Sequence, residues 1–245
     1  MNPFEALVRM IYPPKCVVCG AFIEDEKPPA DRPYPLFCRS CLARWEPLSS
    51  PVCTCCGLPF SGPRQNDHLC GECTRKPPCF DALRAPFIYG ETLTKAVHAF
   101  KYRGQEHLAK PFGRLLADYA ARWLEASPPL LVMPVPLHPR RLRERGFNQS
   151  LLLARPVAKR LQADLDFLAL TRVRYTQTQT GLGHADRREN VHEAFFLKRP
   201  ASVKGRDVLL VDDVATTGNT LNECARILKK AGAWSVKALT LARAV

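Results

Sequence analysis

The sequence has no long hydrophobic run. No stretch approaches the roughly 18 consecutive apolar residues that a membrane helix requires, so a membrane-spanning segment is not expected. The first dozen residues place Glu5 and Arg9 among apolar side chains. They therefore lack the uninterrupted apolar core of a signal peptide and are typical of a short amphipathic helix. We expect a cytoplasmic protein without membrane insertion.

Two nucleotide-binding signatures are also absent. The chain has no G-x4-G-K-[ST] sequence, which disfavours a P-loop, and no glycine-rich dinucleotide fingerprint. Low-complexity tracts are missing, and the internal repetition that we find is a duplicated cysteine pattern. Apolar residues make up 46% of the 245 positions, which is enough to bury a sizeable core. The protein is therefore expected to be globular.

Acidic residues are scarce relative to basic ones. The chain has 36 Lys and Arg against 23 Asp and Glu, a formal net charge of +13 at pH 7. Residues 1–80 are nearly balanced and hold 13 of the 22 prolines, whereas residues 81–245 hold 27 basic and 15 acidic side chains. We expect a small loop-rich module at 1–80 and a larger domain at 81–245. The charge of the larger domain favours a polyanionic or phosphorylated ligand.

Ten of the eleven cysteines lie between positions 16 and 79. A reducing compartment disfavours disulfides, so metal ligation is the expected use. Eight of them form four Cys-x2-Cys pairs, and two such pairs complete one tetrahedral zinc site. Sequential pairing is the simplest arrangement, and crossed pairing stays open. The expected ligands of two structural zinc ions are Cys16, Cys19, Cys38, Cys41, Cys53, Cys56, Cys70 and Cys73. The remaining Cys55, Cys79 and Cys224 are expected to be small buried or partly exposed thiols and not metal ligands.

Residues 81–245 alternate between helical and strand patterns. Helices are predicted around 92–102, 106–126, 148–161 and 220–233, and strands around 130–136, 167–173, 208–211 and 235–244. The segment between 137 and 147 reads as a basic loop, and Pro156 should kink its helix or shift its boundary. This alternation predicts an α/β fold with a mostly parallel sheet covered by helices on both faces. Ligands of such sheets bind at the carboxyl ends of the strands.

The stretch "VLLVDDVATTGNTL" at 208–221 combines an apolar run, two acids and a loop of hydroxyls around one glycine. Two adjacent carboxylates at the end of a strand are costly to bury unless hydroxyl groups or a cation contact them. Asp212 and Asp213 are therefore expected to contact such groups. The following loop presents backbone N–H groups at a helix start, which favours an anion. A ribose 5-phosphate meets both needs, and the alternative is an Asp-Asp turn with threonine caps. The loop comprises Ala215, Thr216, Thr217, Gly218, Asn219 and Thr220.

These residues resemble the phosphoribosyl-pyrophosphate motif of type I phosphoribosyltransferases. The resemblance implies that fold, with the acids on the ribose hydroxyls, the loop on the 5-phosphate, and magnesium on the pyrophosphate. In such folds the loop after the first core strand meets the pyrophosphate, which implies a place there for Pro136, Leu137 and His138. A cluster of four arginines follows and could neutralise phosphates or simply form solvated surface. Its members are Arg140, Arg141, Arg143 and Arg145.

The segment "VMPVPLHPRRLRERGFNQS" at 132–150 extends the match, as do the double cysteine module and "QTQTGLGHADRRENVHEAF" at 177–195. Together they resemble the ComF family of competence-associated proteins, which includes the GntX-like proteins. That family resemblance implies a role in handling DNA during natural transformation. The resemblance to related transferases also implies a mobile loop over the reacting centre between 172 and 190, with Gln179, Arg187 and Asn190 as candidates. Arg187 and Asn190 are equally expected to hold that loop to the fold. The candidate catalytic residues are Gln179 and Arg187 beside Asp212, Asp213 and Arg145. Asn148 is equally expected to cap a helix or to contact substrate.

Three functions remain open at this point. The first is binding of phosphoribosyl pyrophosphate by a protein that handles single-stranded DNA, with or without transferase turnover. The second is a phosphoribosyltransferase of the salvage type, whose acceptor the sequence does not declare. In the third, the zinc ribbons are an adapter to a DNA translocation or recombination partner.

Overall fold

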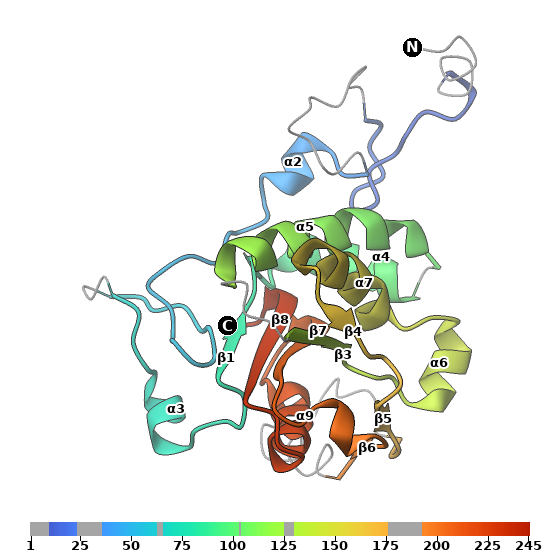
Figure 1. Ribbon diagram of the computed structural model, residues 1–245. Helices are drawn as coiled ribbons and strands as arrows, with labels where there is room; N and C mark the ends of the chain where they lie inside the picture. The colour runs from blue at the N-terminus through green and yellow to red at the C-terminus, as the bar shows by residue number, and fades with distance from the viewer. Residues whose placement is uncertain (1–9, 24–35, 63–65, 103, 125–129, 176–192) are drawn as a thin grey trace.

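The computed structural model describes residues 10–23, 36–62, 66–102, 104–124, 130–175 and 193–245 (Figure 1). The expected 176–190 portion of the loop, with Gln179 and Arg187, lies outside the described residues. The helices are α2 (Arg39–Leu42), α3 (Gly71–Arg75), α4 (Glu91–Tyr102), α5 (Ala109–Trp123), α6 (Pro139–Arg145), α7 (Gln149–Leu161) and α9 (Asn219–Lys230), with 3-10 turns η1 (Glu106–Leu108) and η2 (Pro200–Ser202). The strands are β1 (Ala82–Arg84), β2 (Phe87–Ile88), β3 (Leu130–Pro134), β4 (Asp164–Leu165), β5 (Leu170–Arg172), β6 (Phe195–Leu197), β7 (Asp207–Ala215) and β8 (Ser235–Arg243).

The main sheet has the strand order β1-β8-β7-β3-β4, and β2 also pairs with β8. Each of these pairings is parallel, which confirms the predicted α/β class. Side chains alternate along β7 as a strand requires. Leu209 and Val211 belong to one core cluster, and Val208 and Leu210 to the other. Helices α4, α5 and α7 lie over one face of the sheet and α9 over the other (Figure 1).

The basic segment after β3 is a helix, so the prediction of a loop at 137–147 was wrong for most of its length. His138 is the N-cap of α6, and its Nδ1 accepts a hydrogen bond from the Arg140 amide at 3.2 Å. Proline at the first helical position suits this start. Gly146 ends the helix with a φ of +86°, a conformation that favours glycine. The arginines therefore project from a short capped helix beside the sheet.

One strand pairing needs correction, and one of the two effects expected of Pro156 is excluded. The strand predicted near 167–173 is β5, but it pairs antiparallel with β6 in a separate two-stranded sheet. Helix α7 runs through Pro156 to Leu161, so the proline does not shift its boundary. Gly113 of α5 faces that proline, and a Cβ at position 113 would clash with Pro156 Cγ. The missing side chain thus lets α5 and α7 approach closely.

The two cysteine-rich segments pack on opposite faces of the sheet. Phe37, next to the first cysteine cluster, stacks on Phe112 of α5 with ring centroids 5.7 Å apart. Trp45 joins the same core cluster. Cys53 of the second cluster is fully buried in the other core, together with Leu83 of β1. Each ribbon is therefore anchored to the α/β domain through its own face. Within the described part of the chain, every helix is too short or too polar to cross a bilayer.

Candidate functional site

Two cysteine tetrads form as the sequential model predicts. Within each tetrad all sulfur atoms lie within 4.8 Å of one another, close enough for four ligands of one ion. The second tetrad also receives backbone N–H···S hydrogen bonds, from Cys56 and Cys70 to Cys53 Sγ at 3.4 and 3.3 Å. Such bonds stabilise thiolates, which zinc requires. Zinc therefore fits both sites, Cys16–Cys19–Cys38–Cys41 and Cys53–Cys56–Cys70–Cys73.

The acid pair lies within strand β7, which continues to Ala215 instead of ending after Val211. Asp213 is only 3% exposed. Its Oδ1 atom forms an ion pair with Lys101 Nζ of α4 at 2.8 Å, whereas its buried Oδ2 atom has no hydrogen-bond partner among the described residues. A buried carboxylate oxygen without a partner is costly, so it marks a place where a hydrogen-bond donor of a ligand would be accepted.

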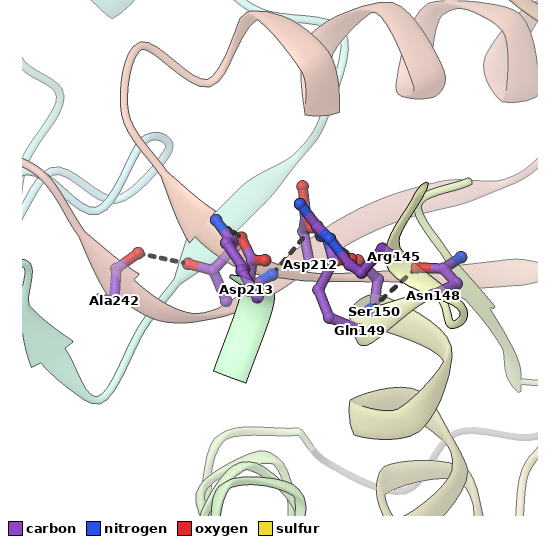
Figure 2. Close-up of polar contacts among 9 residues, drawn as sticks. Arg145, Asn148, Gln149, Ser150, Asp212, Asp213 and Ala242 are labelled. Carbon is purple, nitrogen blue, oxygen red and sulfur yellow. Dashed lines mark hydrogen bonds and ion pairs between the residues drawn. The ribbon is translucent and has the colours of Figure 1, made fainter. Parts of the chain in front are cut away.

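Asp212 is held from the side of α7. Its Oδ1 atom accepts hydrogen bonds from Ser150 Oγ at 2.7 Å and from the Asp213 amide at 2.9 Å (Figure 2). Burial and, after it, the neighbouring charge of Asp213 raise the pKa of Asp212 to about 7, against the opposing effects of Ser150 and Lys101. One carboxylate of the pair thus has a lysine partner, and the other titrates near neutrality.

The segment "RGFNQS" positions these groups (Figure 2). Asn148 is the N-cap of α7, because its Oδ1 accepts a hydrogen bond from the Ser150 amide at 3.0 Å, and its Nδ2 donates to the Val135 carbonyl at 3.2 Å. Of the two roles expected for Asn148, the structure therefore supports the cap. The Arg145 guanidinium donates to Gln149 Oε1 and lies 4.9 Å from the centre of the Tyr102 ring.

The loop between β7 and α9 has the geometry of an anion site. Gly218 is the N-cap of α9 with a φ of +75°, which requires glycine, and the twelve-residue helix begins at Asn219. The first N–H groups of a helix lack intrahelical acceptors and carry partial positive charge. Thr216 is exposed, and Thr217 and Thr220 are partly buried. The loop thus offers hydroxyl and amide donors at the carboxyl edge of the sheet.

These features meet in a cavity of about 270 Å³, here called the acid-pair cavity. Of the residues predicted from the sequence, those that line it are Asp212, Asp213, Thr216, Thr220, Pro136, Leu137, Arg141 and Arg145. Its lining also includes Tyr89, Lys101, Tyr102, Gln149, Ser150 and Arg172, which the sequence analysis did not single out.

Several predicted residues lie elsewhere. His138 caps α6, Arg140 pairs with Glu144 at 3.0 Å, and Arg143 is exposed on the same helix. None of these three lines the acid-pair cavity. Thr217, Gly218 and Asn219 face a different cavity of about 530 Å³, which lies between the loop, α9 and the second cysteine tetrad. The loop therefore separates two cavities.

Lys101 is a site residue that the sequence could have indicated. It continues the row Leu93, Val97, Lys101 at a spacing of four residues, which places it on the buried face of α4. A lysine on an apolar face needs an anionic partner, and the acid pair is the natural one. Arg172 had no comparable signal, because β5 is short and outside the main sheet.

Comparisons with known proteins agree with this architecture. Residues 148–244 match the phosphoribosyl transferase domain, and residues 7–74 match the double zinc ribbon domain. The DNA utilization protein YhgH of Escherichia coli strain K12 is 38% identical over 196 residues, covering 78% of this chain and 84% of the relative. Competence protein F of Haemophilus influenzae is 35% identical over 200 residues, covering 80% and 86%. Competence protein ComFC of Bacillus subtilis is 28% identical over 222 residues, covering 86% of both chains.

The matches with these relatives cover most of the chain, and the family models match both the cysteine module and the α/β domain. A double zinc ribbon followed by a phosphoribosyltransferase-type domain is the organisation that the sequence motifs predicted. This protein belongs to the ComF family of competence-related proteins.

Proposed function

We propose that the protein binds phosphoribosyl pyrophosphate, with magnesium, in the acid-pair cavity, and that it handles incoming single-stranded DNA in the cytoplasm during natural transformation. The observation that carries the ligand is the acid pair, with Asp213 buried, beside a threonine- and glycine-rich helix start. Asp213 offers an acceptor without a partner, which suits a ribose hydroxyl. The names of the relatives, DNA utilization protein and competence protein, support the DNA role.

In this proposal each end of the cavity has a separate task. Asp212 and Asp213 accept hydrogen bonds from the ribose hydroxyls, and the amides and hydroxyls around Thr216 and Thr220 donate to the 5-phosphate. Arg141 and Arg145 line the same cavity and can stabilise the negative charge of the pyrophosphate. Magnesium would supply further neutralisation of that charge.

Asp212→Asn is expected to weaken binding of phosphoribosyl pyrophosphate about 10- to 100-fold, because hydrogen bonds to a charged group contribute roughly 1.5–3 kcal/mol. Isothermal titration calorimetry with magnesium at pH 8 measures this. Asp207→Asn is the matched control, since Asp207 lies at the other end of β7 and accepts from Ser235 Oγ at 2.6 Å. Absence of binding to the unaltered protein, or equal affinity of the Asp212→Asn protein, would contradict the proposed ligand.

Transferase turnover is a second question about the same site. Transfer would break the bond between ribose C1 and the pyrophosphate oxygen, form a bond from C1 to an acceptor nitrogen, and release one proton from that nitrogen. Lys101, Arg141 and Arg145 supply positive charge around the leaving group. Pyrophosphate release should be assayed with a panel of bases and with single-stranded DNA. Binding without release under every condition would leave a sensing or DNA-binding role.

For DNA, the arginines of α6 are expected to contribute to the salt dependence of binding. Each arginine that neutralises a phosphate of a single strand contributes about 0.7 to the slope of log affinity against log salt. We compare Arg141→Gln/Arg145→Gln, which changes the cavity, with Arg140→Gln/Arg143→Gln, which changes the outer surface of α6. Fluorescence anisotropy with a labelled oligonucleotide at several salt concentrations gives the slope for each variant.

The control for this experiment removes the same charge elsewhere. Arg155→Gln/Arg160→Gln changes two exposed arginines of α7. If single-stranded DNA binds along α6, the slope of log affinity against log salt should fall by about 1.4 in at least one of the two α6 variants and stay constant in the control. Equal slopes in all variants would remove α6 from the DNA path.

A further inference from the structure

Arg243 is a buried arginine that joins the second cysteine tetrad to the anion loop. It is the last residue of β8 and is 5% exposed. Its Nε atom donates to the carbonyl of Cys56 at 3.2 Å. Its Nη1 atom donates to the carbonyls of Ala215 at 3.1 Å and of Thr216. One guanidinium thus contacts a metal-ligand residue and the first two residues of the loop.

The charge of the second cysteine tetrad explains how the Arg243 guanidinium can be buried beside it. A zinc ion with four thiolate ligands carries a net double negative charge, and Cys56 is one of those ligands. Arg243 is therefore buried against an anionic centre, where a planar guanidinium can satisfy several carbonyls at once. Without the metal, the cysteines would be protonated or separated, and the arginine would lose this compensation.

The hydrogen bonds from Arg243 fix the orientation of the loop amides. A trans peptide is planar, so its C=O and N–H groups point in opposite directions. The carbonyls of Ala215 and Thr216 point at Arg243, and the amides of Thr216 and Thr217 therefore point away from it. An anion cradle requires this preorganisation of its donors.

Other contacts place the second tetrad module against the same loop. The Phe80 ring lies 3.8 Å from the position that a Cβ would take on Gly218. The Cys79 amide donates to Asn222 Oδ1 of α9 at 2.6 Å. By contrast, the first module packs on the opposite core through Phe37 and Trp45. The two zinc centres therefore have different relations to the ligand site.

We propose that the second zinc centre is a working part of the phosphate site, and that Arg243 is the positioning residue that connects them. Loss of zinc from the Cys53–Cys56–Cys70–Cys73 tetrad then loosens the loop and weakens anion binding. Loss of zinc from the first tetrad has a much smaller effect. The effect on binding of phosphoribosyl pyrophosphate rests on the proposed function. The effect of Arg243 on the order of the loop does not depend on any ligand.

The test combines zinc content, amide hydrogen exchange and calorimetry. Arg243→Met is expected to retain two zinc ions per chain, to speed amide exchange at residues 216–218 at least tenfold, and to weaken binding of phosphoribosyl pyrophosphate with magnesium about tenfold. Arg84→Met is the matched control. Arg84 donates to the carbonyls of Cys53 and Thr54 in the same knuckle, at 3.3 and 3.0 Å, and among the described residues it makes no hydrogen bond to the loop. It should leave loop exchange and affinity within twofold of the unaltered protein.

Two further variants keep the inference testable if Arg243→Met does not fold. Arg243→Lys retains the charge but lacks the planar fork, and should reproduce the faster exchange. Cys73→Ser and Cys41→Ser each remove one zinc with Arg243 intact, and the first should weaken binding at least fivefold more than the second. Normal loop exchange in both Arg243 variants, or equal losses in the two cysteine variants, would overturn the inference. If the unaltered protein binds no phosphoribosyl pyrophosphate, the proposed ligand fails, but the exchange comparison still decides the role of Arg243.

Discussion

Removing zinc from the protein is expected to unfold both cysteine modules and to release two zinc ions per chain. The helices α2 and α3 of these modules have only four and five residues. Segments of this size bury too little surface to fold alone. Zinc contributes roughly 10–16 kcal/mol of apparent binding free energy to such domains. This is the largest effect that we expect from any single change.

The effect should reach the α/β domain through both cores. Phe37 and Trp45 are 1% and 5% exposed and belong to the core that covers α5. Cys53 and Phe80 belong to the core on the other face. Amide exchange after chelation should therefore rise first in residues 36–62 and 66–80, and then in α5 and β1. Zinc released on thiol modification gives the stoichiometry. Freshly purified protein with less than one zinc per chain would contradict the assignment.

The sequence "CTCC" at 53–56 offers a matched pair of substitutions. Cys56 is a member of the second tetrad, whereas Cys55 lies outside it, with its Sγ 3.7 Å from the Phe80 carbonyl. Cys56→Ser is expected to reduce the zinc content to one ion per chain, and Cys55→Ser to leave it at two. Equal zinc loss in both variants would show that the tetrad is assigned incorrectly.

The zinc ligands and the sheet were predictable because their signals are local. Cys-x2-Cys spacing is set by the knuckle itself, and sequential knuckles need no knowledge of distant contacts. Strand β7 is predicted by a continuous apolar run, and helix α9 by an amphipathic pattern that ends near a glycine. The anion loop between them follows from the same stretch.

The rest of the site depends on contacts across the sheet. Strands β1, β2 and β4 have two or three residues, too few for a periodic pattern, and pair with strands far away in the chain. Helix α6 was read as a loop because charged residues dominate it, although arginine and glutamate are good helix formers. The full contact set of Arg243 joins residues up to 187 positions apart and could not be predicted from the sequence.

The two aspartates of the acid pair are expected to affect stability in opposite directions. Asp212 has a pKa of about 7 in the folded protein because it is buried beside Asp213, against about 3.9 in an unfolded chain. The folded state therefore binds this proton more tightly, and the free energy of unfolding falls as pH rises from about 4 to 7. Asp212→Asn removes this loss and should stabilise the protein at pH 8 by on the order of 2–4 kcal/mol.

The measurement for Asp212→Asn is urea unfolding at pH 5.5 and pH 8. The gain over the unaltered protein should be about half as large at pH 5.5 as at pH 8, because the loss of stability accumulates between the unfolded pKa of Asp212, about 3.9, and its folded pKa of about 7. Asp207→Asn, at the other end of the strand, should show no such increase with pH. A gain that does not depend on pH would mean that packing, and not ionisation, explains the change.

Asp213→Asn is expected to destabilise the protein by roughly 3–5 kcal/mol, because it leaves the largely buried Lys101 without its ion-pair partner. Burial lowers the pKa of Lys101, but Asp213 and then Asp212 raise it above its ordinary value, so Asp213→Asn removes the main support for this buried charge. Adding Lys101→Met to the Asp213→Asn protein removes the lysine that has lost its partner. This second substitution should restore most of the lost free energy of unfolding. A double-mutant cycle over the two positions measures this coupling at pH 8. Coupling below about 0.5 kcal/mol would show that the ion pair does not hold the acid pair in place.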